Sequence, residues 1–172
     1  MLMASALCGC GSKDASEPII TKTDIEVVGG QYTPEIMHRL GKVSDPQVSP
    51  DGSKILYGVT YTSIEQNKGN RELYIMDIDG SNNVKITNTP KSESNARWID
   101  DSKIIYMRGG NLYTATLNGT EISQEIEVAG AQGFEGFELS PDNSKIMFVK
   151  SVKAAVKPAD LYPDLDKSSG RT

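Results

Sequence analysis

The sequence predicts an all-β fold of short antiparallel strands, and two observations lead to this prediction. A ten-residue pattern that begins at Val48 occurs three times, so the chain repeats one supersecondary unit. Turn formers are frequent, with 16 glycines and 8 prolines in 172 residues, which favours many short strands over long helices. No apolar run approaches the length of about 18 residues that a membrane-spanning helix needs.

Charge and cysteine content argue against several classes of site. The net charge of -5 and the pI near 4.9 argue against nucleic-acid binding, because no basic stripe is present to neutralise phosphates. No cysteine follows Cys10, so residues 11–172 can form neither a disulfide nor a thiolate metal site. We expect no cofactor and no metal ion.

Residues 1–18 are expected to be the remnant of an export signal followed by a polar tether. Leu7-Cys8-Gly9-Cys10 resembles a bacterial lipobox, in which an aliphatic and two small residues precede the cysteine that becomes acylated. Cys10 is therefore the expected lipidation site. Each buried methylene of an acyl chain contributes about 0.8 kcal/mol, so several chains would hold an exported protein at a periplasmic or outer-membrane surface.

The same stretch departs from a normal signal sequence in two ways. It has no positively charged region at its start, and its apolar part is short. We therefore expect translation to begin upstream, unless Cys8 and Cys10 are a chance pair. A metal-binding Cys-x-Cys is a further interpretation, but no other cysteine or nearby histidine completes a ligand shell.

Residues 19–43 are expected to form a strand and a short helix that lead into the repeats. Ile25–Val28 is β-prone and is followed by two glycines. The helix signals are a capping Thr33, Pro34 at the first helical position, Glu35 near the positive end and Gly41 at the stop. His38 is the only histidine, and we expect it at the surface of this helix. A histidine that acts as the base of a catalytic triad needs a nucleophile, and no motif in the sequence presents one.

Residues 44–150 contain three copies of a strand–turn–strand unit. The copies are Val48–Tyr57, Arg97–Tyr106 and Leu139–Phe148. The first turn, Ser49-Pro50-Asp51-Gly52, places proline where φ is preset and glycine where φ is positive. Asn143 replaces that glycine in the third copy and Asp101 replaces it in the middle copy, which we expect to have the least ideal turn.

The first two copies each have a second half, because Glu72–Gly80 parallels Asn111–Gly119. Asp79-Gly80 and Asn118-Gly119 are two-residue hairpin signals in which both residues are expected to have positive φ. Val84–Thr87 then supplies a fourth strand. Four strands in about 40 residues match one blade of a β-propeller. The sequence thus predicts a partial β-propeller of about two and a half four-stranded antiparallel blades, with a short N-terminal helix.

Several residues in the repeats admit both a functional and a structural interpretation. The first unit is longer because of a polar insertion, Thr62–Asn70, which is expected at a blade edge, where function often lies. Asp77–Gly80 resembles a calcium loop but lacks the downstream glutamate of an EF-hand, so a plain turn is favoured. Lys54, Lys103 and Lys145 are expected at solvated rims. The repeat aromatics are expected to pack between blades, with a stacking platform for sugars or bases as the alternative: Tyr57, Tyr74, Trp98, Tyr106 and Tyr113.

The repeat resembles the propeller repeats of TolB-like proteins and of prolyl oligopeptidase-type (S9-like) serine peptidases. Three stretches favour the peptidases. Thr33–Pro46 is similar to the helix that leads into their first blade, Asn67–Tyr74 to their first-blade insertion, and Leu161–Gly170 to a connector after the start of their third repeat. The resemblance covers roughly residues 31 to 172.

In that family a propeller is joined to an α/β-hydrolase domain that carries a Ser-Asp-His triad, and the propeller shields the active site and limits substrate size. The resemblance implies no catalytic residue here, because the chain has no Gly-x-Ser-x-Gly elbow and His38 precedes the first blade. Glu135 and Glu138 lie in the third repeat, but they match no motif that grips a substrate amine.

We therefore expect the N-terminal propeller portion of an exported, lipid-anchored dipeptidyl- or oligopeptidase, inactive alone, that controls the access of peptides to a hydrolase domain absent from this chain. Residues 151–172 are expected to be an irregular, truncated connector. The alternative is a TolB-like periplasmic lipoprotein that serves as a protein-binding scaffold, and a third hypothesis is a short lipoprotein that completes its ring by oligomerising. An open arc leaves two blade faces uncovered, so self-association through these faces is also expected.

Overall fold

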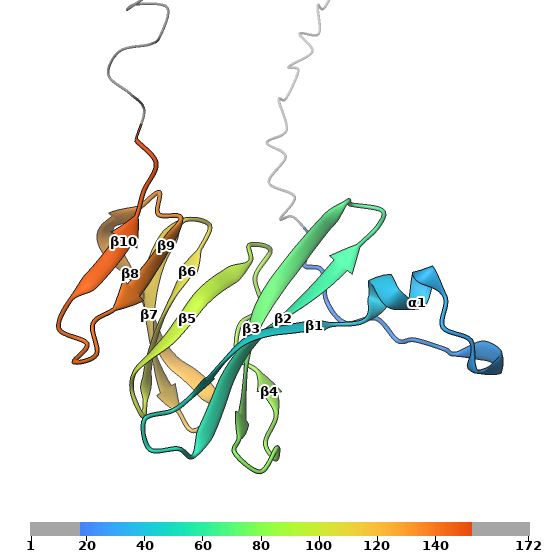
Figure 1. The fold of residues 1–172 in the computed structure, drawn as a ribbon, viewed down its shortest axis with the longest axis horizontal. Coiled ribbons are helices and arrows are strands. Elements are labelled where there is room, and N and C mark those ends of the chain that lie inside the picture. Colours follow the sequence, from blue (N-terminus) through green and yellow to red (C-terminus); the bar gives the residue numbers. More distant parts are fainter. Residues whose placement is uncertain (1–17, 153–172) are drawn as a thin grey trace, which may run out of the picture.

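The computed structural model describes residues 18–152, which form three antiparallel sheets standing side by side (Figure 1). The first sheet has the order β1 (Lys42–Val48), β2 (Lys54–Ser63), β3 (Lys68–Asp77) and β4 (Val84–Lys85). The second has the order β5 (Glu93–Asp100), β6 (Lys103–Arg108), β7 (Asn111–Asn118) and β8 (Glu121–Gln132). The third pairs β9 (Gly136–Leu139) with β10 (Ile146–Val149). The all-β prediction and the two four-stranded units are therefore confirmed.

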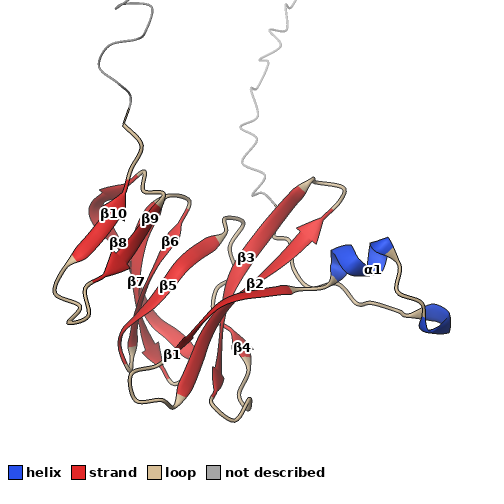
Figure 2. Ribbon diagram, in the orientation of Figure 1, coloured by secondary structure: helices blue, strands red, loops and turns tan. Residues whose placement is uncertain are grey.

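Helical structure is confined to the N-terminal side of the described residues (Figure 2). A 3-10 turn, η1 (Val28–Gly30), precedes α1 (Pro34–Arg39). The Thr33 hydroxyl accepts a hydrogen bond from the Ile36 N–H across 3.4 Å, as the capping signal predicts. Ile36 is the buried residue of α1, which packs on β2, whereas His38 is exposed.

The strand predicted at Ile25–Val28 is not formed. Residues 25–27 are irregular, and Val28 begins η1. No strand pairs with this stretch in the described part of the chain, and β-propensity is realised only where a partner edge supplies cross-strand contacts.

The two Asx-Gly hairpins differ from the prediction by one residue. Gly80 and Gly119 have positive φ, at 86° and 65°, but Asp79 and Asn118 do not. In the first hairpin the Gly80 N–H donates to the Asp77 carbonyl across 2.8 Å. In the second, Asn118 pairs with Glu121, so the loop is residues 119–120. Within each two-residue signal the glycine is therefore the left-handed residue, and the first hairpin has a second one at Asn82, with φ of 49°.

The turns of the repeated unit follow two designs. Gly52 and Asn143 have φ of 73° and 54°, as predicted for the first and third copies. Asp101 does not have positive φ, because Asp100 pairs directly with Lys103 and leaves a shorter loop of residues 101–102. Without proline and glycine, the middle copy thus uses a tighter turn rather than a distorted version of the same turn.

Two apolar cores hold the sheets together. The core between the first and second sheets consists of Leu56, Leu73, Ile75, Ala96, Trp98, Ile104, Tyr106, Ala115 and Leu117. The core toward the third sheet consists of Ile105, Met107, Leu112, Ala131 and Phe137. Adjacent residues of β6 alternate between the two cores, so the second sheet is covered on both faces. Full burial of one such Leu or Ile side chain contributes about 1.5–3 kcal/mol.

Candidate functional site

Three charged residues lie on the first strands of the three sheets, and a fourth reaches them from β3. We call Asp45, Arg71, Arg97 and Glu138 the charged row. A bulge in β1 between Ser44 and Gln47 gives Asp45 a φ of 53°. Such bulges re-aim side chains, and the Asp45 carboxylate here reaches β5. Arg97 Nη1 lies 2.9 Å from Asp45 Oδ2, and Arg97 Nη2 lies 3.3 Å from Glu138 Oε1. One guanidinium on β5 therefore links β1 to β9.

Arg71 joins the row from β3 because Gly58, on the neighbouring strand, has no side chain. A Cβ at Gly58 would lie 2.1 Å from Arg71 Nε. From this position the Arg71 guanidinium donates to the Ser44 carbonyl across 3.4 Å and to the Glu93 carbonyl across 3.3 Å. Burial lowers the pKa of Arg71. Burial alone would also lower the pKa of Arg97, but its hydrogen bonds to Asp45 and Glu138 raise it.

The row lies beside an open groove. Trp98 Nε1 donates to the Gln47 carbonyl across 3.1 Å, and Asn95, in the bulge of β5, donates to the Phe137 carbonyl across 3.1 Å. These bonds tie each first strand to the next. The groove has a volume of about 310 Å³ and is lined by Gln47, Val48, Pro50, Arg97, Trp98, Glu138, Leu139, Ser140, Pro141 and Asn143.

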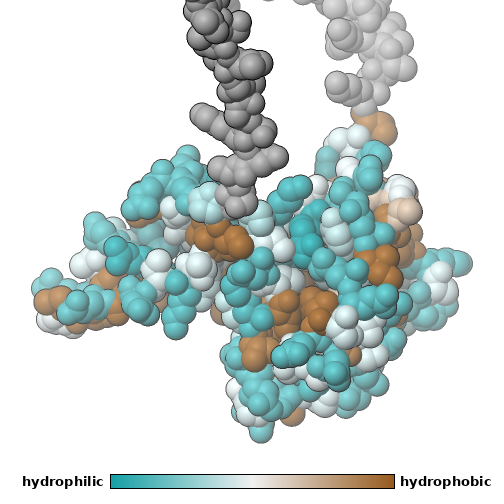
Figure 3. All heavy atoms as spheres, turned by 180° about the vertical axis from the view of Figure 1, so that it is seen from behind, coloured by the Kyte–Doolittle hydropathy of each residue, from teal (hydrophilic) through white to brown (hydrophobic). Residues whose placement is uncertain are grey.

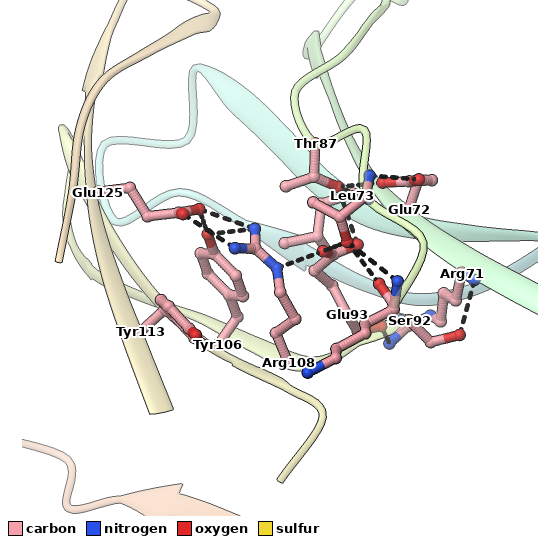
Figure 4. Close-up of polar contacts among 12 residues, drawn as sticks. Arg71, Glu72, Leu73, Thr87, Ser92, Glu93, Tyr106, Arg108, Tyr113 and Glu125 are labelled. Atoms are coloured by element: carbon pink, nitrogen blue, oxygen red, sulfur yellow. Dashed lines mark hydrogen bonds and ion pairs between the residues drawn. The ribbon is translucent and has the colours of Figure 1, made fainter. Parts of the chain in front are cut away.

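A second polar group lies where residues 86–92 cross from the first sheet to the second (Figure 4). We call Glu72, Thr87, Thr89, Glu93 and Arg108 the junction cluster. Glu72 is 1% exposed and Glu93 is fully buried. Glu72 Oε1 accepts from the Asn70 side-chain amide and from the Thr89 N–H, each across 3.0 Å. Glu93 Oε1 accepts from Arg108 Nε across 2.7 Å and from the Thr89 hydroxyl across 2.8 Å.

Arg108 connects the junction cluster to β8 and to two tyrosines (Figure 4). Its two terminal nitrogens lie 2.9 and 2.8 Å from the two carboxylate oxygens of Glu125, which also accepts a hydrogen bond from the Tyr106 hydroxyl. The guanidinium carbon lies 4.8 Å from the Tyr113 ring centroid. Burial alone would lower the pKa of Arg108, but its hydrogen bonds to Glu125 and Glu93 raise it. Burial raises the pKa of Glu93 to about 7.

The two polar groups suit different tasks. Each carboxyl oxygen of the junction cluster lies within hydrogen-bond distance of a polar group inside the protein, so the cluster is suited to holding two sheets together. In the charged row, the Glu138 side chain is 57% exposed and the Arg97 side chain is 20% exposed beside the groove. The charged row is therefore the part that can contact a ligand.

The residues singled out from the sequence have mixed outcomes. Lys54 is not a solvated rim residue, because it forms an ion pair of 2.9 Å with Asp77 across β2 and β3. Asp77 also accepts from Asn82 across 2.6 Å, which agrees with the turn interpretation. Glu138 belongs to the charged row, whereas Glu135 accepts a hydrogen bond from Ser151. Within residues 18–152, no group of three or more His, Cys, Asp or Glu could hold a metal ion.

The repeat aromatics divide between two environments. Trp98 and Tyr106 lie in the core between the first two sheets, as predicted, and Tyr113 packs against it. Tyr57 and Tyr74 lie outside this core and stack on each other with ring centroids 5.7 Å apart. Cys10 and the connector similarity at residues 161–170 lie outside the described residues.

The sequence reasoning missed the charged row and the junction cluster. One signal was present for the first of these. Arg97 occupies the position that Val48 and Leu139 occupy in the other two copies of the repeat, and a charge at an apolar repeat position indicates a special environment. Glu72 and Glu93 carried no such signal, because they are far apart in the sequence and resemble ordinary surface glutamates.

Comparisons with known proteins find relatives among curated sequences and among solved structures. No family model matches the chain. The chain is 35% identical, over 99% of its length, to dipeptidyl-peptidase 5 of Porphyromonas gingivalis. It is 30% identical, over 81% of its length, to dipeptidyl-peptidase 5 of Porphyromonas endodontalis. It spans 24% and 20% of the lengths of these two curated relatives.

The fold is also similar to part of a solved structure. Pyrococcus horikoshii acylaminoacyl peptidase matches 69% of this chain with a TM-score of 0.54 and 19% identity, and the match covers 18% of that protein. The resemblance to prolyl oligopeptidase-type peptidases is thus confirmed. The chain is related over nearly all of its length to the dipeptidyl-peptidase 5 proteins, and it spans about a quarter of such a peptidase.

Proposed function

We propose that residues 44–150 are consecutive blades of a β-propeller in a peptidase, and that this propeller limits which peptides reach a hydrolase domain. The observation that carries the proposal is the 35% identity to a dipeptidyl-peptidase over 99% of the chain. Two successive four-stranded antiparallel sheets and the start of a third support the propeller arrangement. The scaffold alternative gains no support from these two relatives, since both are named as peptidases.

In this proposal the charged row faces the passage that peptides use. The first strand of each blade lies nearest the central channel of a propeller, and β1, β5 and β9 are the first strands here. Arg97 and Glu138 would present a cation and an anion to the polar groups of a passing peptide. We expect them to affect the choice of peptide rather than the bond-breaking step.

We further propose export and anchoring by acylation at Cys10, for peptides outside the cytoplasm. The lipobox-like stretch Leu7–Cys10 supports this proposal. None of the helices within residues 18–152 has the length and apolar character needed to cross a bilayer. Nucleic acid remains an unsuitable partner for a chain of net charge -5.

The outer apolar surfaces suit contact with further protein. Met147, Phe148 and Val149 of β10 are each more than half exposed, and Figure 3 shows apolar patches on an otherwise mainly hydrophilic face. We propose that the chain alone self-associates through such faces. Sedimentation velocity over a range of concentrations measures this, and a monodisperse monomer with a sharp two-state melt would contradict it.

A chimera tests the proposed function. The chain replaces the matching quarter of the Porphyromonas gingivalis relative, and hydrolysis of dipeptidyl chromogenic substrates is measured. We expect the chimera to be active and the 172-residue chain alone to show no turnover. A chimera that is folded by circular dichroism but inactive would overturn the proposal, as would turnover by the chain alone.

The charged row is tested in the same chimera. Arg97→Met removes the cation while keeping much of the side-chain length, and we expect it to change the ratio of activities on short and long peptides. Lys145→Met is the matched control, because Lys145 is exposed at the third repeat turn and lies outside the groove lining. If both variants change the ratio of activities on short and long peptides equally, the charged row has no role in substrate selection.

A further inference from the structure

Two buried carboxyl groups of the junction cluster approach the same hydroxyl group. Thr87 Oγ1 lies 2.7 Å from Glu72 Oε2 and 3.1 Å from Glu93 Oε2. The same oxygen also accepts a hydrogen bond from the Leu73 N–H across 2.9 Å. Figure 4 shows Glu72 and Glu93 converging on this point from β3 and from the start of β5.

Counting protons shows that these contacts cannot all be hydrogen bonds if both carboxyl groups are ionised. A threonine hydroxyl has one proton to donate, and a carboxylate has none. Thr87 can therefore satisfy either Glu72 Oε2 or Glu93 Oε2, but not both. The other oxygen would face a lone pair in a buried site, which is costly.

We propose that Glu72 and Glu93 share one proton across the Thr87 hydroxyl, and that this proton holds the junction between the first and second sheets. With one carboxyl protonated, Thr87 accepts from that carboxyl and from the Leu73 N–H, and donates its own proton to the other carboxylate. All three positions around the hydroxyl are then satisfied. The proposal concerns the junction itself and does not depend on a peptidase role.

The charges around the pair are consistent with one negative charge rather than two. Arg108 of β6 is the cation in contact with Glu93, and it also pairs with Glu125 of β8. Arg71 of β3 donates to the Glu93 carbonyl, forms an ion pair with Asp45 at 3.8 Å, and also interacts electrostatically with the Glu93 carboxyl group. The Lys91 carbonyl lies 2.7 Å from Thr89 Oγ1 and so competes with Glu93 Oε1, at 2.8 Å, for the single proton of that hydroxyl. Arg108 therefore divides its charge between Glu93 and Glu125.

The remaining groups near Glu93 are neutral. Tyr106 of β6 donates to Glu125, and burial raises the pKa of Tyr106, so the phenol keeps its proton. Thr89 lies on the crossing segment and Asn70 lies on β3. Burial is also the main reason why the pKa of Glu93 is raised to about 7, with the Glu72 charge as a further cause.

The shared proton makes the junction sensitive to pH. The pKa of Glu93 is higher in the folded chain, at about 7, than its ordinary value of 4.5. Its contribution to stability is therefore complete below about pH 4.5 and is lost as the pH rises through about 7. Above neutral pH, two carboxylates would compete for one hydroxyl proton at the point where residues 86–92 enter the second sheet.

Carbon NMR of the glutamate carboxyl groups in the 172-residue chain tests the proposal. We expect one glutamate Cδ resonance to titrate near pH 7, far above the ordinary value of 4.5. Glu93→Gln should remove this titration, whereas Glu72→Gln should move it to lower pH without abolishing it, because the Glu72 charge and the competition for the Thr87 proton are lost while Glu93 stays buried. Glu127→Gln is the control, since Glu127 is exposed on β8 and bonds Asn111 and Tyr113 instead.

The outcomes separate the possibilities. If no glutamate of the unaltered chain titrates above pH 6, the pair holds no proton and the proposal fails. A neutral titration that persists in Glu93→Gln, or one that does not move in Glu72→Gln, shows that the two residues do not share the proton and overturns the proposal. The urea midpoint supplies a second measurement that needs no variant: it should fall between pH 6 and pH 8, and a midpoint that rises over this interval contradicts the proposal.

Discussion

Asp101 accepts a hydrogen bond from the backbone N–H of Asp51 across 2.8 Å, and this bond joins the repeat turns of the first and second sheets. The third turn is attached in a related way, because the Asn143 side chain donates to the Ile99 carbonyl across 2.7 Å. Residues at the variable position of the repeat thus connect each turn to the neighbouring sheet. The departure of Asp101 from the repeat pattern supplies the acceptor for the Asp51 N–H.

Replacing Asp101 with alanine should expose the Asp51 amide to exchange. The bond is at the surface, so its net contribution is roughly 1 kcal/mol or less, which corresponds to at most about a fivefold change in exchange rate. Hydrogen exchange of the Asp51 amide measures this. Asp101→Asn keeps an acceptor oxygen and should leave the exchange unchanged, so equal exchange in both variants would show that the bond does not form in solution.

The lipidation proposal predicts a difference between two cysteines that lie two residues apart. Cys10→Ser should abolish incorporation of radiolabelled palmitate and release the protein from the membrane fraction of a bacterial host. Cys8→Ser should change neither, because only the residue that follows the cleavage position is acylated. Labelling that survives in the Cys10 variant, or that depends equally on both cysteines, contradicts the assignment.

The sequence predicted the strands of the repeats well because their signals are local. The apolar run Ile55–Tyr57 and the turn residues before it indicate a hairpin without reference to distant contacts. In the structure the repeat tyrosines pair across neighbouring strands, since Tyr57 faces Tyr74 and Tyr106 faces Tyr113. Turn details were less predictable, because one glycine allows more than one loop length.

The junction cluster could not be predicted because its chemistry depends on long-range contacts. Glu72 and Glu93 become unusual only when the chain crosses between sheets and brings Thr87 between them. Lys54 was misjudged for a similar reason, since its partner Asp77 lies on another strand. The local sequence pattern predicts which face of a strand a residue occupies, but it does not predict which charged residue of another strand will lie next to it.

Gly58→Ala should destabilise the chain because of Arg71. The new Cβ would lie 2.1 Å from Arg71 Nε and 2.3 Å from its Cζ, so the guanidinium must leave its contacts with the Ser44 and Glu93 carbonyls. We expect a loss of about 1–3 kcal/mol in the free energy of unfolding, the usual range for overpacking. Denaturant unfolding at constant pH measures this loss.

A double-mutant cycle isolates the cause of that loss. In an Arg71→Ala background no guanidinium remains over Gly58, and Gly58→Ala should then be neutral or stabilising by about 0.5–1 kcal/mol, because glycine is unfavourable inside a strand. Gly136→Ala is the matched control, since its Cβ would come no nearer than 3.6 Å to the Asn95 side chain. If Gly58→Ala lowers the free energy of unfolding equally in both backgrounds, the strain comes from the β2 backbone. Arg71 would then not require a glycine at position 58.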